Sequence, residues 1–212
     1  DRSEGYDYIS VAHHKDDQAE SILAHIIRGS GLNGLTGMSV VQSEYAIPVV
    51  RPLLDVTKED LLAYTGTKHI SYCVDSTNED VRYQRNRIRH RIIPELEAVN
   101  PAVVDAIVRL GSSVNEDVMV ISDLTSRTFD KLVSIGDDEV RISRRALRQE
   151  PLAIQRRLWQ RLVSTIDSDL TLTSAHQEQL LDIVNTGEKK TFTIKSIKVI
   201  VQCDTIKVYC KH

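Results

Sequence analysis

Cysteine is scarce in this sequence, and the few cysteines present are not spaced as pairs. Cys73, Cys203 and Cys210 are odd in number, lie far apart and form no C-x-x-C pair. This pattern argues against a disulfide framework and against a zinc or iron–sulfur site, and it is typical of a reducing compartment.

Long apolar runs are also missing. No stretch approaches the length that crosses a membrane, and no signal peptide opens the sequence. We therefore expect a cytoplasmic protein with no membrane partner. The 212 residues are 41% hydrophobic and 27% charged, which is the balance of a soluble globular protein and is enough for two modest cores.

Neither sign of charge dominates, since the formal net charge is only −3. The total therefore does not predict a nucleic-acid partner, and such a prediction has to rest on local clusters.

A Walker A phosphate loop is absent too: the glycine-rich loop from Gly29 to Met38 lacks Gly-Lys-Ser or Gly-Lys-Thr and follows a predicted helix. Its glycines indicate either a close backbone approach or a plain tight turn.

The most informative segment is an acidic one where a predicted strand meets a predicted helix. The apolar run 6–12 predicts a buried strand, and the helix that follows it, from Asp16 to Arg28, ends before Gly29, a typical C-cap residue. Asp17 and Glu20 are three residues apart and share one flank of this helix. That flank is turned away from the apolar stripe, which consists of Ala19, Ile22, Leu23, Ile26 and Ile27.

Open α/β sheets bind ligands beyond the carboxyl ends of their strands, where this acidic segment is expected to lie. Asp17 and Glu20, together with the imidazoles of His13 and His14, could hold a divalent cation or an ammonium group there. Acidic residues in a first helical turn also favour the helix dipole without any ligand, and from the residues alone this alternative stays open.

A second cluster is basic. The segment from Arg82 to Arg91 carries five arginines in ten residues. If it is helical, Arg82, Arg85 and Arg89 lie along one side while Ile88 and Ile92 form a buried stripe. Guanidinium groups bind phosphates by paired hydrogen bonds, so the segment is a candidate for a nucleotide or an RNA backbone. The alternative is a solvated helix whose arginines pair with acidic residues.

A more diffuse basic group follows later in the chain. Most of it is expected to be surface solvation, although it could extend an RNA footprint. Its members are Arg144, Arg145, Arg148, Arg156, Arg157 and Arg161.

Residues 1 to about 95 have the pattern of the end of an α/β domain. Residues 45–50 predict a strand in which Pro48 indicates an edge position, and residues 75–78 predict a turn. Thr57 and Asp60 predict the start of a helix that Gly66 ends. A sheet with so few strands could not cover its own faces, so we expect an N-terminal portion of this domain upstream of the sequence.

Beyond Asn100-Pro101 the pattern changes to helices. Apolar spacing predicts a long helix through 103–121, then helices over 151–166 and 174–187, and two or three antiparallel strands within 192–209. We therefore predict an α/β fold class, with a partial doubly wound parallel sheet in residues 1–98. A mostly helical second domain with a small antiparallel β element follows in residues 99–212.

Four segments, taken in order, resemble the tRNA(Ile)-lysidine synthetases, a family of N-type ATP-pyrophosphatases. They are AHHKDDQAES, RGSGLNGLTGM, RPLLDVTKEDLLAY and VDSTNEDVRYQRNRIRHRIIP. The resemblance is close from about Tyr6 to Pro101 and continues more weakly to Tyr209. It implies a PP-loop domain with an adenine nucleotide alpha hydrolase-like fold in residues 1–98, and a helical domain that binds tRNA or substrate in residues 99–212.

The resemblance also implies an activity. Family enzymes use ATP to adenylate C2 of the wobble cytidine in an isoleucine tRNA with a CAU anticodon, and they release pyrophosphate. The ε-amino group of free L-lysine then displaces AMP, which produces lysidine. Members are often dimeric, so a homodimer stays open.

Roles for the acidic residues follow by position. The resemblance implies that His13 and Asp17 face ATP and Mg²⁺, with Asp17 as a metal ligand, and that Asp17 and Glu20 receive the lysine substrate. Asp17, Glu20 and Arg85 would be the catalytic residues. Glu20 would orient the lysine amine, and a carboxylate or histidine beside the amine could act as base.

The basic segment and the glycine loop also match family motifs. The R-N-x-x-R-H motif would contact the tRNA and the phosphate of the activated intermediate. The loop would lie beside the cytidine pocket. The matching positions are Arg85, Asn86, Arg89 and His90 for the motif, and Gly29, Ser30 and Gly31 for the loop.

The sequence departs from the family pattern in two places. The S-G-G-x-D-S loop that binds the ATP pyrophosphate does not occur in it, and neither does the further C-terminal domain of longer members. We expect the loop upstream of Asp1 and expect this polypeptide alone to be inactive, although it is an enzyme by descent.

Two alternatives to lysidine synthesis stay open. One is another enzyme of the same ATP-pyrophosphatase type, such as a tRNA thiolase or a small-molecule amidotransferase, although the paired cysteines common in thiolases are missing. The other is a non-catalytic tRNA-binding module.

Overall fold

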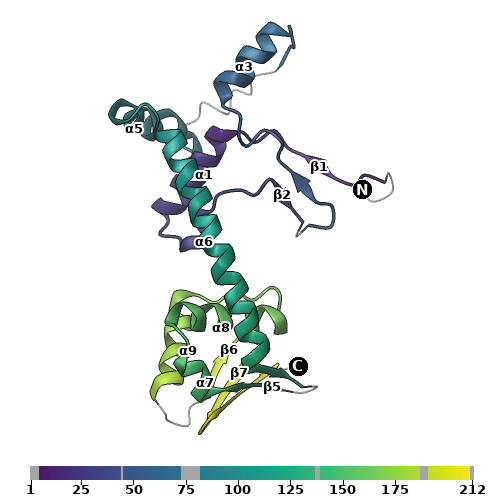
Figure 1. Ribbon diagram of the computed structural model, residues 1–212, viewed down its shortest axis with the longest axis vertical. Helices are drawn as coiled ribbons and strands as arrows, with labels where there is room; N and C mark the ends of the chain where they lie inside the picture. The colour runs from purple at the N-terminus through teal and green to yellow at the C-terminus, as the bar shows by residue number, and fades with distance from the viewer. Residues whose placement is uncertain (1–4, 44, 73–81, 137–138, 187–190, 211–212) are drawn as a thin grey trace. The chain divides into compact units, whose positions relative to one another are not determined.

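The computed structural model describes residues 5–43, 45–72, 82–136, 139–186 and 191–210. Contacts divide the chain into two compact units, Asp1–Val118 and Met119–His212. The first holds a small sheet with helices α1 to α5, and the second holds a larger antiparallel sheet with helices α7 to α9 (Figure 1). The division falls inside the long helix α6 (Val103–Leu132), and the predicted boundary near residue 98 stays a prediction.

The sheet of the first unit has three strands of two residues each: β1 (Ile9–Ser10), β2 (Val41–Gln42) and β3 (Val49–Val50). β3 is the central strand, parallel to β1 and antiparallel to β2. The edge position indicated by Pro48 is therefore wrong. Pro48 precedes the strand and contributes only its carbonyl, which accepts a hydrogen bond from the Ile9 amide at 2.9 Å, so its missing N–H costs nothing there.

The buried strand predicted for residues 6–12 is exposed. Tyr6, Tyr8 and Ile9 keep 65%, 61% and 47% of their surface in contact with solvent. Within the described residues β1 pairs with β3 alone. A run of apolar residues becomes buried only where layers cover both faces of its sheet, and a two-residue strand at the margin of a three-stranded sheet lacks that cover.

Helix α1 (Lys15–Ile27) confirms the predicted helix after this strand. Arg28 is its C-cap, and Gly29 adopts the left-handed conformation at φ +74° that ends a helix most readily in glycine. The stripe is buried only in its first half. Ala19 and Ile22 form a core with Ile107 of α6, whereas the last two stripe residues, Ile26 and Ile27, are about half exposed.

Helix α6 approaches α1 closely because of Gly111. A Cβ at this position would lie 2.7 Å from Ile22 Cδ1 and 3.2 Å from the Leu35 carbonyl oxygen, at the end of the short helix α2 (Leu32–Leu35). The absence of a side chain therefore permits the contact that buries the first half of the apolar stripe of α1.

Helix α3 (Lys58–Thr67) begins as predicted, since the Thr57 hydroxyl accepts a hydrogen bond from the Asp60 amide at 3.1 Å. Gly66 does not end it. The helix continues through Thr67, and the left-handed residue that follows is His69, at φ 51°. The predicted turn at 75–78 lies outside the described residues.

The arginine-rich segment is helical but not uniformly so. It consists of α4 (Gln84–Arg87), a π-helical turn η3 (Ile88–Ile92) and α5 (Ile93–Val99), in which Pro94 lies in the first turn. Within η3 the Ile93 amide donates to the Ile88 carbonyl, five residues back. This extra residue per turn moves the buried stripe, so Ile93 is buried with Ile88 where the sequence predicted Ile92.

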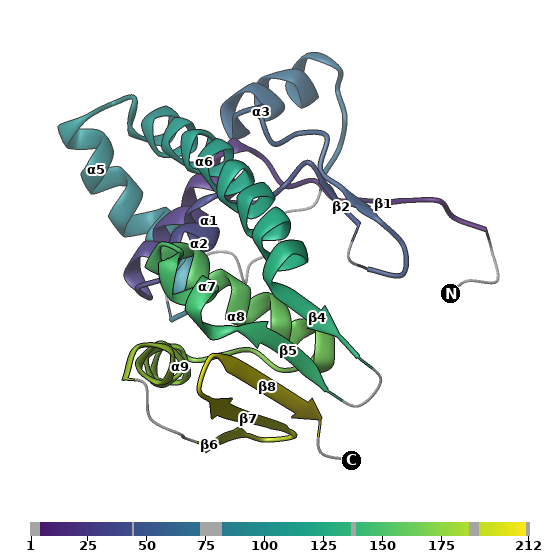
Figure 2. The same ribbon diagram turned by 60° about the horizontal axis from the view of Figure 1, so that its bottom comes forward.

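The second unit is an antiparallel sheet packed against helices. The strand order is β4-β5-β8-β7-β6, with β8 between β5 and β7 (Figure 2). The bounds are β4 (Val133–Ile135), β5 (Val140–Ser143), α7 (Arg144–Gln149), α8 (Leu152–Ile166), α9 (Ser174–Thr186), β6 (Thr191–Ile194), β7 (Ile197–Gln202) and β8 (Thr205–Cys210).

The sequence predicted two or three C-terminal strands; the structure has three, β6 to β8, and adds β4 and β5 to the same sheet. The sequence did not predict β4 and β5. Both strands are short, and they follow α6, whose helical pattern continues to Leu132. The core of the unit is centred on Trp159 and Leu162 of α8, which pack against alternating apolar residues of β7 and β8. The predicted small β element is therefore a full layer of this unit.

We expect Gly111→Val to destabilise the chain by about 1–3 kcal/mol, because the added methyl groups meet Ile22 and the Leu35 carbonyl in a packed interface. Urea unfolding followed by circular dichroism measures the change. The control is Gly66→Ala in α3, where a Cβ meets nothing within 4 Å. It should stabilise by about 0.5–1 kcal/mol through helix propensity. Equal effects of the two substitutions would contradict the packing role of Gly111.

Candidate active site

The candidate site lies where α1 begins, directly after the strand β1. The first two turns of α1 carry Asp17 and Glu20 on the flank that faces α4 and η3. These two segments carry Arg85 and Arg89, which are four residues apart and therefore project from the same side of a helix. The predicted convergence of the acidic helix start and the arginine segment is confirmed by direct contacts.

Four side chains form a closed network of charges, which we call the charge cluster: Asp17, Glu20, Arg85 and Arg89. Arg85 donates from Nε to Glu20 Oε2 and from Nη2 to Asp17 Oδ1, both at 2.9 Å. Arg89 donates from Nη2 to Asp17 Oδ1 at 2.8 Å and to Glu20 Oε2 at 2.9 Å, and from Nε to Glu20 Oε1 at 2.5 Å. Each arginine thus bridges the same two carboxylates.

The cluster is buried on its acidic side. Glu20 is 1% exposed and Asp17 is 7% exposed. Carboxylates at such sites need compensation by opposite charge, and the two guanidinium groups supply it. The hydrogen bonds that Arg89 donates to Glu20 hold the pKa of its guanidinium group above the usual range. The side chains of Arg85 and Arg89 are 48% and 21% exposed, so Arg85 is the outer partner and Arg89 the inner one.

The two histidines flank this cluster differently. His14 precedes α1, and its backbone amide donates to Asp17 Oδ2 at 3.0 Å. Its ring lies against Asp16, and hydrogen bonding from His14 lowers the pKa of the Asp16 carboxyl to about 2. The pKa of His13 is lowered by burial in the first place and by neighbouring cations, although Asp17 opposes this shift.

Sequence reasoning missed Arg51, which belongs to this site. It follows β3, is 9% exposed and donates from Nε to His13 Nδ1 at 3.3 Å. The segment RPLLDVTKEDLLAY that carries it was part of the resemblance, but a single arginine in a loop gives no periodic signal that would have marked it.

The remaining predicted site residues differ in burial and in their distance from the charge cluster. Asn86 is half-buried and His90 is exposed on the same segment as the two arginines of the charge cluster. The loop residues Gly29, Ser30 and Gly31 follow the other end of α1, twelve residues beyond Asp17. At 1.5 Å per residue this is about 18 Å along the helix axis, so the structure does not bring the loop glycines to the charge cluster.

The last residue of the glycine loop, Met38, is hydrogen-bonded to Gln18 of α1. The Gln18 side chain accepts a hydrogen bond from the Met38 amide at 2.6 Å and donates to the Met38 carbonyl at 2.8 Å. Gly37 has φ +73°, and a Cβ there would lie 2.7 Å from Gln18 Oε1. Of the two readings of these glycines, close backbone approach therefore applies at Gly37.

The charge cluster does not fit a metal ion in this arrangement. The Asp17 and Glu20 oxygens already accept hydrogen bonds from two cations, which would repel a third. Among the residues that the structure describes, no group of three or more histidine, cysteine, aspartate or glutamate side chains is arranged to hold a metal. No helix within the described ranges is long and apolar enough to cross a membrane.

Comparison with known proteins shows that this site lies in a known kind of domain. A family model described as a PP-loop domain matches residues 2–96. Three relatives named tRNA(Ile)-lysidine synthase extend the match. The one from Porphyromonas gingivalis strain ATCC 33277 is 44% identical over 135 residues, which are 64% of this chain and 29% of the relative. The Geobacter sulfurreducens relative is 31% identical over 82% of this chain and 37% of its own length. The Bacillus subtilis relative is 30% identical over 85% and 39%.

Residues 2–96 match a PP-loop domain, and the chain is similar to tRNA(Ile)-lysidine synthases over most of its length. It spans between 29% and 39% of the length of these three relatives. The match to the PP-loop domain includes the whole charge cluster, so the family resemblance seen in the sequence and the buried ion pairs of the structure concern the same residues.

The charge cluster should be essential to the stability of this protein. We expect Arg89→Met to destabilise the chain by about 3–5 kcal/mol, because it removes the inner cation from two buried carboxylates. Adding Glu20→Gln should recover part of this loss, which a double-mutant cycle by urea unfolding would measure. Arg127→Met is the control, since Arg127 and Asp123 form an exposed pair on α6. It should cost less than about 1 kcal/mol. A loss of similar size at both arginines would contradict the compensation argument.

Proposed function

We propose that this chain carries the lysine-accepting part of an active site that uses ATP and free L-lysine to convert the wobble cytidine of tRNA(Ile), with its CAU anticodon, to lysidine. The observation that carries this proposal is the convergence of Asp17 and Glu20 with Arg85 and Arg89 at the carboxyl end of β1. Such a site offers negative charge for an amine and positive charge for a phosphate within one network.

The carboxylates support the binding of an ammonium group. Asp17 and Glu20 lie side by side on α1, and two guanidinium groups already bridge them in the free chain. A lysine ammonium can compete for the same oxygens only where a cation can leave. Arg85 is the more exposed of the two arginines, so we propose that the substrate amine takes the place of Arg85 while Arg89 stays.

Displacement of Arg85 would also serve the first half of the reaction. A guanidinium that leaves the carboxylates becomes available to an anion, and the activated intermediate is a phosphate ester of the cytidine. Asn86 and His90, on the same segment, extend this basic surface toward the tRNA. Catalysis would then rest on Asp17, Glu20 and Arg85, with Glu20 orienting the amine for attack at C2 and AMP as the leaving group.

ATP enters this proposal as a substrate, and His13 is our candidate contact to it. Mg²⁺ is implied by the family, but the Asp17 carboxylate is engaged by two arginines, and we derive no step through the metal. Gly29, Ser30 and Gly31 follow the other end of α1, so we propose that they contact the tRNA outside the charge cluster. The reaction is proposed to take place in the cytoplasm, with a homodimer as the assembly to be tested.

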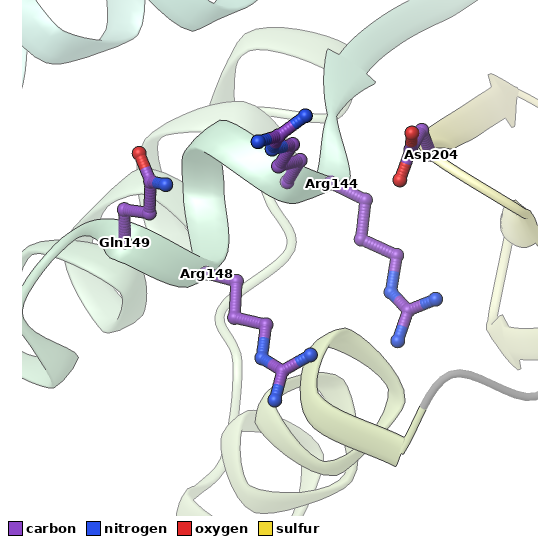
Figure 3. A pocket seen from close by; sticks show the side chains of 5 residues that line it. Arg144, Arg148, Gln149 and Asp204 are labelled. Atoms are coloured by element: carbon purple, nitrogen blue, oxygen red, sulfur yellow. The ribbon is translucent and has the colours of Figure 1, made fainter.

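A basic pocket in the second unit supports tRNA as the partner. It has a volume of about 420 Å³ and is lined by Arg144, Arg145, Arg148, Gln149 and Asp204. Arg144 is committed to structure, since it donates to the carbonyls of Val184 and Cys203. The Arg148 side chain extends away from α7 (Figure 3). Among the described residues no partner is recorded for Arg145 or Arg148, so both can receive a phosphate.

The lysine assignment predicts a selective kinetic defect. In the full-length protein, Glu20→Ala should raise KM for lysine by about tenfold or more while KM for ATP changes less, because the lost carboxylate contacts the amine. Steady-state formation of lysidine on tRNA(Ile) measures both constants. Glu97→Ala, at an exposed position of α5, is the control. An unchanged KM for lysine would defeat the assignment.

The tRNA assignment of the basic pocket is tested separately. We expect Arg145→Gln/Arg148→Gln to weaken tRNA binding by this chain and to reduce the salt dependence by about one to two ions, because two phosphate contacts are lost. Filter binding at a series of salt concentrations measures the slope. The control Arg127→Gln/Lys131→Gln removes the same charge from α6 of the same unit. The same slope for both double variants would contradict the assignment, because the pocket would then contribute only its net charge.

A further inference from the structure

Arg51 donates three directed hydrogen bonds, all to residues outside its own loop. It is 9% exposed, and each nitrogen of its guanidinium group donates a hydrogen bond. Nη1 donates to the Ser39 carbonyl at 3.0 Å, Nη2 donates to Gln42 Oε1 at 2.9 Å, and Nε donates to His13 Nδ1 at 3.3 Å. Two of these bonds fix the guanidinium plane against the segment that contains β2, and the third is aimed at the imidazole.

The contact to His13 determines where the imidazole proton lies. A guanidinium group has only donors and keeps its charge at every relevant pH, so the partner of Arg51 Nε must supply a lone pair. His13 Nδ1 therefore accepts, and the single proton of the neutral ring is on Nε2. A protonated ring would direct a second N–H at the Arg51 cation.

The surroundings of His13 favour the same state. Burial is the largest contribution and lowers the pKa of His13. Asp17 raises this pKa, whereas Arg85, Arg51 and His14 each lower it. The ring is thus neutral at neutral pH, in agreement with the hydrogen bond from Arg51.

We propose that Arg51 is a positioning residue that holds His13 as the neutral tautomer with its proton on Nε2, so that His13 acts as a hydrogen-bond donor and not as a base. With Nδ1 engaged by Arg51 and Nε2 protonated, the ring has no free lone pair to take a proton from the lysine amine. It can donate to an acceptor oxygen of the bound nucleotide. This last step rests on the proposed function, whereas the tautomer does not.

The tautomer can be read from nitrogen-15 NMR of the labelled 212-residue chain. We expect the His13 ring, identified by its loss in His13→Gln, to show an unprotonated Nδ1 and a protonated Nε2 as a single species at neutral pH. A nitrogen–nitrogen coupling across the hydrogen bond should connect Arg51 Nε with His13 Nδ1. In Arg51→Gln the coupling should disappear, the two ring nitrogens should shift toward averaged values, and the pKa of His13 should rise because a neighbouring cation is gone.

Three further variants separate positioning from a merely structural role. Gln42→Ala removes one acceptor of Arg51 but leaves Nε in place, so the coupling should persist. Arg51→Lys keeps the charge without the planar group and should lose the single tautomer. Arg28→Lys, at the exposed C-cap of α1, should change none of these signals.

A proton on Nδ1 of His13 in the unaltered chain would overturn the proposal, whether or not any Arg51 variant folds. So would an unchanged tautomer and pKa in folded Arg51→Gln. Because the readout needs neither ATP nor tRNA, a failed tautomer prediction leaves the proposed lysidine synthesis standing. A failed activity assay likewise leaves the tautomer untouched.

Discussion

A carboxylate removed from water requires an opposite charge beside it, and this requirement organises the first unit of the protein. Glu20 and Asp17 are almost wholly buried on α1, and their compensation comes from two arginines that lie 65 to 72 residues further along the chain. The arginine segment therefore has to lie against the first two turns of α1. The ion pairs that hold the two segments together are made by the same side chains that we propose take part in the chemistry.

The local structure is irregular around the charge cluster. The arginine segment passes through a π-helical turn between Arg87 and Ile93. The turn shifts the phase of the helix, so Ile88 and Ile93 are buried while Arg85 and Arg89 keep their position against α1. π turns of this kind are common at functional sites, because they re-aim side chains without ending the helix.

Hydrogen bonding also ties separate parts of the first unit to the start of α1. Arg51 joins His13 to Ser39 and Gln42, and Gln18 holds Met38. The contacts are polar and directional, whereas the apolar core around Ile22 is small. In this unit, directed bonds from buried arginine and glutamine side chains do much of the positioning that a larger core does in the second unit, around Trp159.

The sequence by itself determined the elements whose signals are local. Apolar spacing predicted α1 and α6, Gly29 predicted the end of α1, and alternation predicted two or three C-terminal strands where the structure has three. The motifs also predicted that the acidic turn and the arginine segment belong together. Tertiary structure decided the rest: the central place of β3, the exposure of β1, the pairing of β4 and β5 with β8, and the role of Arg51. Burial and pairing depend on which segments meet in space, and no periodicity within one segment can encode its neighbours.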